Sequence, residues 1–423
     1  MERLSNLAGH LLANGPAPAA ASAAPSAAAF PKRDDDVVIV SAVRTPITKA
    51  KRGGFRDTPP DDLLAAAMQA AVQRANVDPK LIGDIVVGNV LQPGAGALTS
   101  RFAQFFAGIP ETTPIVAVNR QCSSGLQACA NIASSIRFGT IDIGLAAGVE
   151  SMTQAPMTAS VPENLNPRVG TNDKASDCLI PMGITSENVA ARYGVSRADQ
   201  DAFAALSHQR AAKAQQEGLF ANEIIPVTVT VTDKEGNEKQ VTVSADDGVR
   251  ADTTAASLSK LKPAFSADGS TTAGNSSQVS DGAAAVVMAR RSVAVKLGLP
   301  ILGTFRGFAV AGVAPDEMGI GPAVAIPAAL EKAGLRVSDI DIYEINEAFA
   351  SQALYSVRKL GIPMERVNPK GGAIALGHPL GCTGARQVST LLYELKRRKQ
   401  RLGVVSMCIG TGAGAAAIFE AEL

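Results

Sequence analysis

The chain has 423 residues, which is enough for two or three domains, and 46 % apolar against 19 % charged residues is typical of a globular protein. Its 40 basic and 39 acidic residues leave a net charge of +1, which argues against nucleic acid as the main partner. No apolar run is long enough to span a membrane, and the five cysteines and three histidines lack disulfide or zinc spacing, so we expect free thiols and no metal.

The first 33 residues differ in composition from the rest of the chain. Leu4, Leu7 and Leu11 fall at helical spacing within residues 1–12. Residues 13–29 contain ten Ala and three Pro, which is typical of a linker. We therefore expect a short separate segment and a linker over residues 1–33, with the folded part beginning near Asp34.

Strands and helices alternate from residue 34 to residue 150, and the strands are nearly all apolar. Buried parallel strands have such apolar sequences, and their alternation with helices favours a layered α/β domain. We expect strands at 37–43, 84–90, 115–119 and 142–149, and helices at 61–76, 97–107 and 123–138. These elements define a first α/β half over residues 34–150.

Residues 151–275 contain more loops, an amphipathic helix near 196–217 and a hairpin centred on 233–237, which indicates an inserted loop domain. Residues 276–300 read as the last strand and helix of the first half, and residues 301–423 as a second α/β half. For the second half we expect strands at 302–311, 340–345, 403–408 and 414–420, and helices at 324–334, 348–360 and 383–398. Each half has a strand ending in Val-Asn, then a Gly-containing loop and a long helix. This favours two similar halves over one continuous sheet.

Two residues stand out as candidates for nucleophile and base. Cys122 lies between a predicted strand and a predicted helix, where the helix dipole and free N–H groups would lower its pKa and favour the thiolate. A small core cysteine is the alternative, and this is how we interpret Cys129 and Cys178. His378 lies in a glycine-rich loop and could act as a general base or as a donor to an oxyanion; a buried structural histidine is the alternative. Cys382, close by in the sequence, is expected to pack.

Two further segments carry candidate polar groups. Cys408 ends an apolar strand and enters a Gly-x-Gly-x-Gly turn, which is not a dinucleotide motif because a strand follows it. We expect a thiol there with backbone N–H donors beside it. Asn346 leaves another apolar strand, where it could hold a water or a carbonyl, or could cap a helix.

The segments NRQCSSG, NEAFA, GHPLGCTGAR and CIGTGAGAA resemble, in order and spacing, the signature blocks of thiolases, and the likeness runs from about residue 35 to the C-terminus. It includes the CoA-side block KLKPAFSADGSTTAGNSSQVSDGAA. The resemblance implies the thiolase fold, with two similar layered α/β halves and an inserted loop domain on the CoA side. It also assigns one role to each candidate residue: nucleophile Cys122, activating base and oxyanion donor His378, water-fixing Asn346, second acid/base Cys408, a backbone oxyanion hole at Cys122 and Gly410, and CoA contacts at Arg250 and Ser277.

The implied reaction is thiolytic cleavage of 3-oxoacyl-CoA by CoA, giving acetyl-CoA and a shortened acyl-CoA in fatty-acid β-oxidation through an acyl-cysteine. CoA is then a substrate, no cofactor is needed, and the family is homodimeric. Arg3-Leu4 and His10-Leu11 resemble a type-2 peroxisomal targeting signal, so residues 3–11 would be bound by an import receptor and the enzyme would be peroxisomal. A mitochondrial presequence would be richer in Arg.

Three alternatives compete with this hypothesis. A biosynthetic acetoacetyl-CoA thiolase would use the same catalytic residues with a narrower acyl pocket. A decarboxylating condensing enzyme of similar fold would lack the second catalytic cysteine. An inactive CoA- or lipid-binding relative would have lost Cys122, His378 or Cys408, and all three are present.

Overall fold

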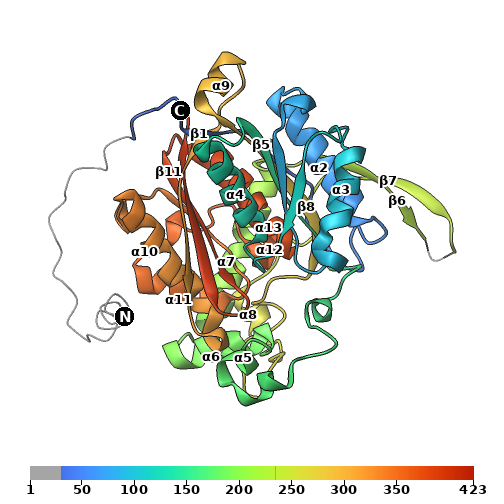
Figure 1. Cartoon of the computed structure of the whole chain (residues 1–423). Helices are drawn as coiled ribbons and strands as arrows, with labels where there is room; N and C mark the ends of the chain where they lie inside the picture. The colour runs from blue at the N-terminus through green and yellow to red at the C-terminus, as the bar shows by residue number, and fades with distance from the viewer. Residues whose placement is uncertain (1–29, 234) are drawn as a thin grey trace. The chain divides into compact units, whose positions relative to one another are not determined.

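Two sets of strands with the same pairing pattern organise residues 32–423 in a computed structural model (Figure 1). The structure describes residues 30–233 and 235–423. The predicted segment over residues 1–12 and nearly all of the predicted linker therefore lie outside the described residues. No helix among those described is long and apolar enough to cross a membrane.

The first set of strands runs in the spatial order β4-β3-β5-β8-β1. Strand β3 is parallel to β4 and β5, whereas β8 is antiparallel to both β5 and β1. A two-residue strand, β2, pairs with β8. The bounds of these strands are β1 Val37–Arg44, β2 Thr48–Lys49, β3 Asp84–Gly88, β4 Ile115–Val118, β5 Ile143–Ser151 and β8 Ser280–Arg290.

The second set repeats the first. In the order β10-β11-β12-β9, the first pair is parallel and the next two are antiparallel. In the position that β4 takes in the first set, Val367 forms a parallel bridge with Tyr343 of β10. The two Val-Asn pairs therefore occupy equivalent positions in the two strand sets. The bounds are β9 Gly303–Gly312, β10 Ile342–Ile345, β11 Leu402–Ile409 and β12 Ala413–Ala421.

The two halves are joined edge to edge. Val38 and Ile39 of β1 pair with Thr304 and Gly303 of β9, which makes the strand order continuous from β10 to β4. The prediction of two similar halves is thus confirmed by the pairing pattern, but the expectation that they would not share a sheet is wrong. The sequence could not reveal this contact because only two residue pairs form it.

Two helices, α4 (Ser124–Phe138) and α13 (Leu380–Arg398), pack together in the centre of the molecule (Figure 1). Their apolar residues share one core cluster with strands of both halves. Glycine permits the close approach, because a Cβ on Gly125 would lie 2.6 Å from the carbonyl oxygen of Gly381. Every residue of α13 from Leu380 to Leu392 is buried, including its polar ones.

Other helices cover the outer faces. Helix α2 buries Leu63, Leu64 and Met68 against the first strand set, and its Pro60, early acidic residues and late Arg74 suit the ends of a helix. In the second half, α10 packs against β9 and β12. The bounds are α2 Pro60–Ala75, α3 Ala97–Phe106, α9 Arg291–Lys296, α10 Gly321–Ala333, α11 Ala350–Leu360 and α12 Ala373–Leu376.

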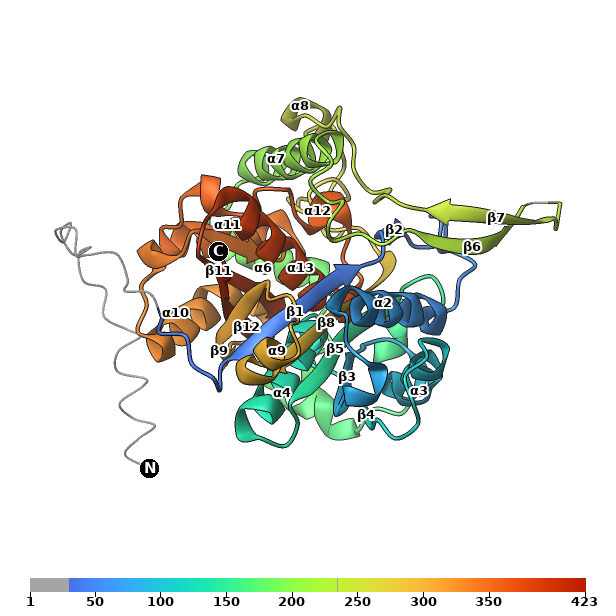
Figure 2. The same cartoon turned by 90° about the horizontal axis from the view of Figure 1, so that it is seen from above.

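The segment between β5 and β8 holds the predicted long helix and hairpin. Figure 2 shows strands β6 and β7 reaching out beyond α2. The bounds are α5 Asp173–Asp177, α6 Met182–Tyr193, α7 Arg197–Gln216, β6 Val227–Thr232, β7 Glu238–Val243 and α8 Ala255–Leu258. The strands and helices expected from the sequence are all confirmed, with ends shifted by up to three residues.

Candidate active site

Cys122 lies in a tight turn between β4 and α4, and neighbouring side chains fix the turn. Gln121 has a left-handed φ of 47°, and its N–H donates to Asn119 Oδ1 over 2.9 Å. The hydroxyl of Ser124 accepts from the N–H of Arg120 over 2.9 Å. The polar residues of the NRQCSSG segment therefore form the turn that presents the half-buried cysteine just before α4.

The backbone N–H groups of Gly410 and of Cys122 itself lie near enough to the sulfur to lower the pKa of the thiol, and they are the two that the resemblance assigns to an oxyanion hole. Burial nevertheless raises the pKa of this thiol to about 11, and the carboxyl of Glu150 raises it further. The expectation of a thiolate at the helix start is wrong, because desolvation outweighs the N–H donors. Cys122 is a thiol at neutral pH and needs a base.

His378 lies between α12 and α13, in the loop predicted from its glycines. Gly377 has a φ of 103°, and the N–H of His378 donates to the carbonyl of Gln278 over 3.1 Å. Burial lowers the pKa of the imidazole to about 3, and the charge of Arg386 lowers it further. The ring is therefore neutral at pH 7, which is the form that can accept a proton.

Hydrogen bonds to both ring nitrogens set the orientation of His378. The hydroxyl of Thr383 donates to the carbonyl of Pro379 over 3.1 Å, so its oxygen accepts from Nδ1, which lies 2.6 Å away. This arrangement leaves Nε2 as the ring acceptor. Asn346 Nδ2 lies 3.2 Å from Nε2. Thr383 was missed by the sequence reasoning, although it stands in the same block as His378.

Asn346 is held at the end of β10 by its backbone. Its N–H donates to the carbonyl of Ser406 over 2.8 Å, and its carbonyl accepts from Gln352 over 2.7 Å. Phe349 is the cap of the next helix, so the helix-cap alternative for Asn346 is wrong. The buried Oδ1 of Asn346 has no hydrogen-bond partner among the described residues.

Cys408 lies at the end of β11, fully buried against Met318, Ala348 and Phe349. Burial raises the pKa of its thiol above the ordinary value, and the electrostatic influence of Cys122 raises it further. The structure thus brings the two cysteines and Gly410 together, and it brings Asn346 to His378. The backbone bond from Asn346 to Ser406, two residues before Cys408, connects the two groups.

The remaining cysteines divide into two kinds. Cys129 and Cys382 are buried in the core between α4 and α13, which confirms that they pack. Cys178 is only partly buried, and its sulfur lies 3.3 Å from the carbonyl oxygen of Lys174 on a short helix. The expectation that Cys178 is a small core residue is wrong, because its helix lies in the inserted segment outside the packed layers.

Glu150 is a second residue that the sequence reasoning missed. It lies on β5 and accepts from the N–H groups of Leu91 over 3.0 Å and of Gly381 over 3.0 Å. Burial raises the pKa of its carboxyl to about 7. One side chain thereby ties the start of α13, which follows His378, to the loop after β3. The only signal in the sequence is an acid within the apolar run of β5.

Ser277 and Arg250, the predicted CoA contacts, lie on adjoining segments. The N–H of Ser277 donates to the carbonyl of Ala348 over 2.9 Å, beside Phe349. Arg250 is exposed, and its N–H donates to His208 Nδ1 over 3.2 Å. Among the described residues there is no cluster of three or more His, Cys, Asp or Glu side chains that could hold a metal ion.

Comparison with known proteins identifies the family. A model of the thiolase N-terminal domain matches residues 37–292, and one of the thiolase C-terminal domain matches residues 299–421. The rat protein 3-ketoacyl-CoA thiolase B, peroxisomal, is 65 % identical over 422 residues, covering 99 % of each chain.

Solved structures agree. The dimeric peroxisomal thiolase of Saccharomyces cerevisiae is 54 % identical with a TM-score of 0.86, over 93 % of this chain and 99 % of that one. The acetyl-CoA acetyltransferase of Bacillus anthracis is 39 % identical with a TM-score of 0.83, over 92 % and 99 %. The chain therefore belongs to the thiolase family and has the thiolase fold.

Proposed function

We propose that Cys122, His378 and Cys408 catalyse the thiolytic cleavage of 3-oxoacyl-CoA by CoA in this chain. The observations that carry the proposal are two thiols that lie together near Gly410 and the neutral imidazole of His378, whose neighbour Asn346 is bonded to the strand of Cys408. Identity of 65 % to a peroxisomal 3-ketoacyl-CoA thiolase, against 39 % to an acetyl-CoA acetyltransferase, favours the degradative reaction over the biosynthetic one. The enzyme acts in peroxisomal fatty-acid β-oxidation.

The first half-reaction breaks the bond between C2 and C3 of the substrate. The proton of the Cys122 thiol passes to Nε2 of His378 as the sulfur attacks the 3-keto carbon. The new oxyanion lies on the carbon bound to sulfur, so the N–H groups of Cys122 and Gly410 are placed to stabilise it. Its collapse expels the enolate of acetyl-CoA, which takes the proton of Cys408 and leaves as acetyl-CoA.

The second half-reaction restores the enzyme. The thiolate of Cys408 takes the proton of incoming CoA, and the CoA thiolate attacks the acyl group on Cys122. The sulfur of Cys122 leaves and recovers its proton from His378. Asn346 and His378, already in contact, are suited to stabilise the thioester oxygen of the enolate. Arg250, Ser277 and the inserted segment 151–275 form the CoA side of the site in this proposal.

The test is the position of the acyl group. Incubation with a 3-oxoacyl-CoA in the absence of added CoA should add the acyl mass to the peptide containing Cys122, detected by mass spectrometry. Cys122→Ser should remove both the label and turnover, because a hydroxyl is far harder to ionise than a thiol. A label on Cys382 or Cys408 would contradict the assignment.

Residues 3–11 are proposed to bind the peroxisomal import receptor. The proposal is supported by their resemblance to a targeting signal and by the peroxisomal names of the relatives. Deleting residues 1–12 should leave thiolysis unchanged while the enzyme stays in the cytosol of an intact cell. Loss of activity in vitro would show instead that this segment is part of the folded enzyme.

A homodimer is also proposed, with the second copy covering α3 and the free edge of β4. Leu98 and Phe106 on α3 are 67 % and 58 % exposed, and Val116 on β4 is 47 % exposed. Large exposed apolar side chains beside an unpaired strand edge are typical of an interface, and the yeast relative is dimeric. Leu98→Asp with Phe106→Asp should give monomers in sedimentation velocity, whereas Phe138→Asp, at an 89 % exposed site on α4, should not. A dimeric double variant would refute this interface.

A further inference from the structure

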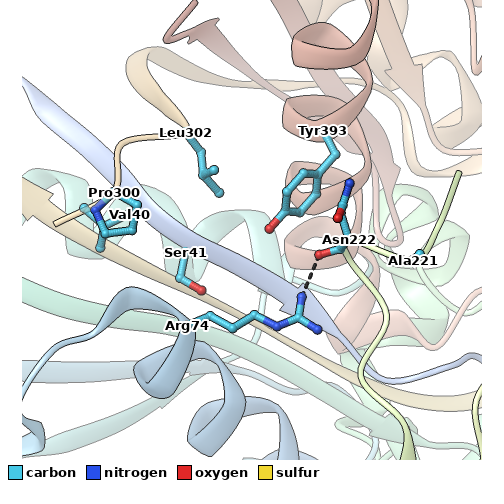
Figure 3. A pocket seen from close by; sticks show the side chains of 8 residues that line it. All are labelled: Val40, Ser41, Arg74, Ala221, Asn222, Pro300, Leu302 and Tyr393. Carbon is cyan, nitrogen blue, oxygen red and sulfur yellow. Dashed lines mark hydrogen bonds between the residues drawn. The ribbon is translucent and has the colours of Figure 1, made fainter.

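A pocket of about 370 Å³ lies apart from the candidate active site (Figure 3). It opens where β1 and α2 of the first half meet the start of the second half, helix α13 and the loop after α7. Ligand sites occur preferentially at such junctions. None of its lining residues belongs to the candidate active site; they are Val40, Ser41, Arg74, Ala221, Asn222, Pro300, Leu302 and Tyr393.

Ser41 gives this pocket an unpaired donor. The register of β1 against β8 shifts between Ile39 and Ser41, which interrupts the regular alternation of the strand. Ser41 is only 2 % exposed, and its hydroxyl has no hydrogen-bond partner among the described residues. Figure 3 shows this hydroxyl and that of Tyr393 facing the same space between Leu302 and Arg74. A buried hydroxyl without a partner is costly, so its position indicates a polar ligand.

Arg74 supplies the positive charge, and it is held in place. Its guanidinium donates to the carbonyl of Asn222 over 2.6 Å and to the carbonyl of Ile224 over 3.2 Å. A guanidinium has five N–H donors, so about three remain for a ligand. The hydroxyl of Tyr393 faces the same space as this guanidinium, so its O–H can donate to a ligand there (Figure 3).

Apart from these groups and the amide of Asn222, the lining is apolar, and it carries no acidic side chain. Two hydroxyl donors and one fixed guanidinium match the two oxygens and single charge of a carboxylate. The apolar walls, formed by Val40, Pro300 and Leu302, match a short alkyl chain better than a strongly hydrated dianion. We propose that this pocket binds a small aliphatic carboxylate, with its oxygens on Ser41, Tyr393 and Arg74 and its chain against these walls.

The experiment is a binding titration of the full chain with acetate, butanoate, hexanoate and inorganic phosphate, by calorimetry and saturation-transfer NMR. We expect butanoate to bind, and the double variant Ser41→Ala with Tyr393→Phe to bind it at least about tenfold more weakly, because two hydrogen bonds to a charged group are lost. Tyr355→Phe, which removes a hydroxyl outside the pocket, should leave binding unchanged.

Thiolysis by the double variant should stay near the wild-type rate, which shows that the variant is folded. The proposal is overturned if the wild-type chain binds no carboxylate, if phosphate binds in place of carboxylates, or if the double variant keeps the wild-type affinity.

Discussion

The hydroxyl of Thr383 should hold His378 in the tautomer that can act as a base. Thr383→Val has nearly the same shape but removes the only described acceptor of His378 Nδ1, at 2.6 Å in the buried interior. Nδ1–H would then be buried without a partner. The other tautomer, with the proton on Nε2, would no longer be disfavoured, and it cannot accept the proton of Cys122.

The size of the effect follows from the contact that is lost. A buried donor left unsatisfied costs about 1–3 kcal/mol. This cost destabilises every state in which Nδ1 carries a proton. If this cost falls on the acylation transition state, the rate of acylation should drop roughly 5- to 150-fold. Thr383→Ser keeps the hydroxyl and should restore most of the rate.

The assay is single-turnover acylation of Cys122 by a 3-oxoacyl-CoA, measured by rapid quench across pH 6–9. Thr390→Val is the matched control, because Thr390 is buried on the same helix and donates to Glu223 over 2.9 Å rather than to His378. It should lower the melting temperature without slowing acylation. Wild-type acylation in Thr383→Val, or equal slowing in both valine variants, would refute the orienting role.

Three further outcomes are expected. Cys408→Ala should still acquire an acyl group on Cys122 from an acyl-CoA while steady-state turnover collapses; normal turnover would remove this thiol from the mechanism. Gly125→Val should lower the free energy of unfolding by about 2–3 kcal/mol or more, because its Cβ would meet backbone 2.6 Å away, whereas Gly170→Ala, where a Cβ meets nothing within 4 Å, should be tolerated. Burial lowers the pKa of His208 to about 4 in the folded chain. As pH falls below about 6.5, the imidazole therefore becomes protonated in the unfolded chain while it stays neutral in the folded one. The free energy of unfolding, measured with urea, should therefore fall by up to about 1.4 kcal/mol per pH unit between pH 6.5 and about 4. It should fall less steeply in His208→Asn.

The elements and the candidate residues could be predicted because their signals are local. Apolar runs between turn residues give the strands, and the position of Cys122 between a strand and a helix follows from them. Its protonation state could not be predicted in the same way. The pKa of Cys122 depends on how many atoms from distant segments exclude water from the sulfur, and no local pattern contains that number.

Thr383 and Glu150 were missed for a related reason. Each acts through a contact whose meaning depends on the fold: Thr383 on a ring five residues earlier, and Glu150 on the N–H of Gly381, 231 residues away. A threonine within a helix and a single acid in an apolar strand have many ordinary explanations. What distinguishes them is burial beside other chain segments, which only the assembled structure provides.

The repeated strand pattern explains why the nucleophile and the base come from different halves. Cys122 and His378 each follow a Val-Asn pair that lies beside an equivalent strand, and each precedes one of the two central helices. Because α4 and α13 are in contact at Gly125 and Gly381, the two loops that precede them are held near each other. Glu150 strengthens this arrangement by bonding the start of α13 to the first half. The geometry of proton transfer is therefore fixed by backbone packing between the halves, so a substitution at their glycine contact should disturb catalysis as well as stability.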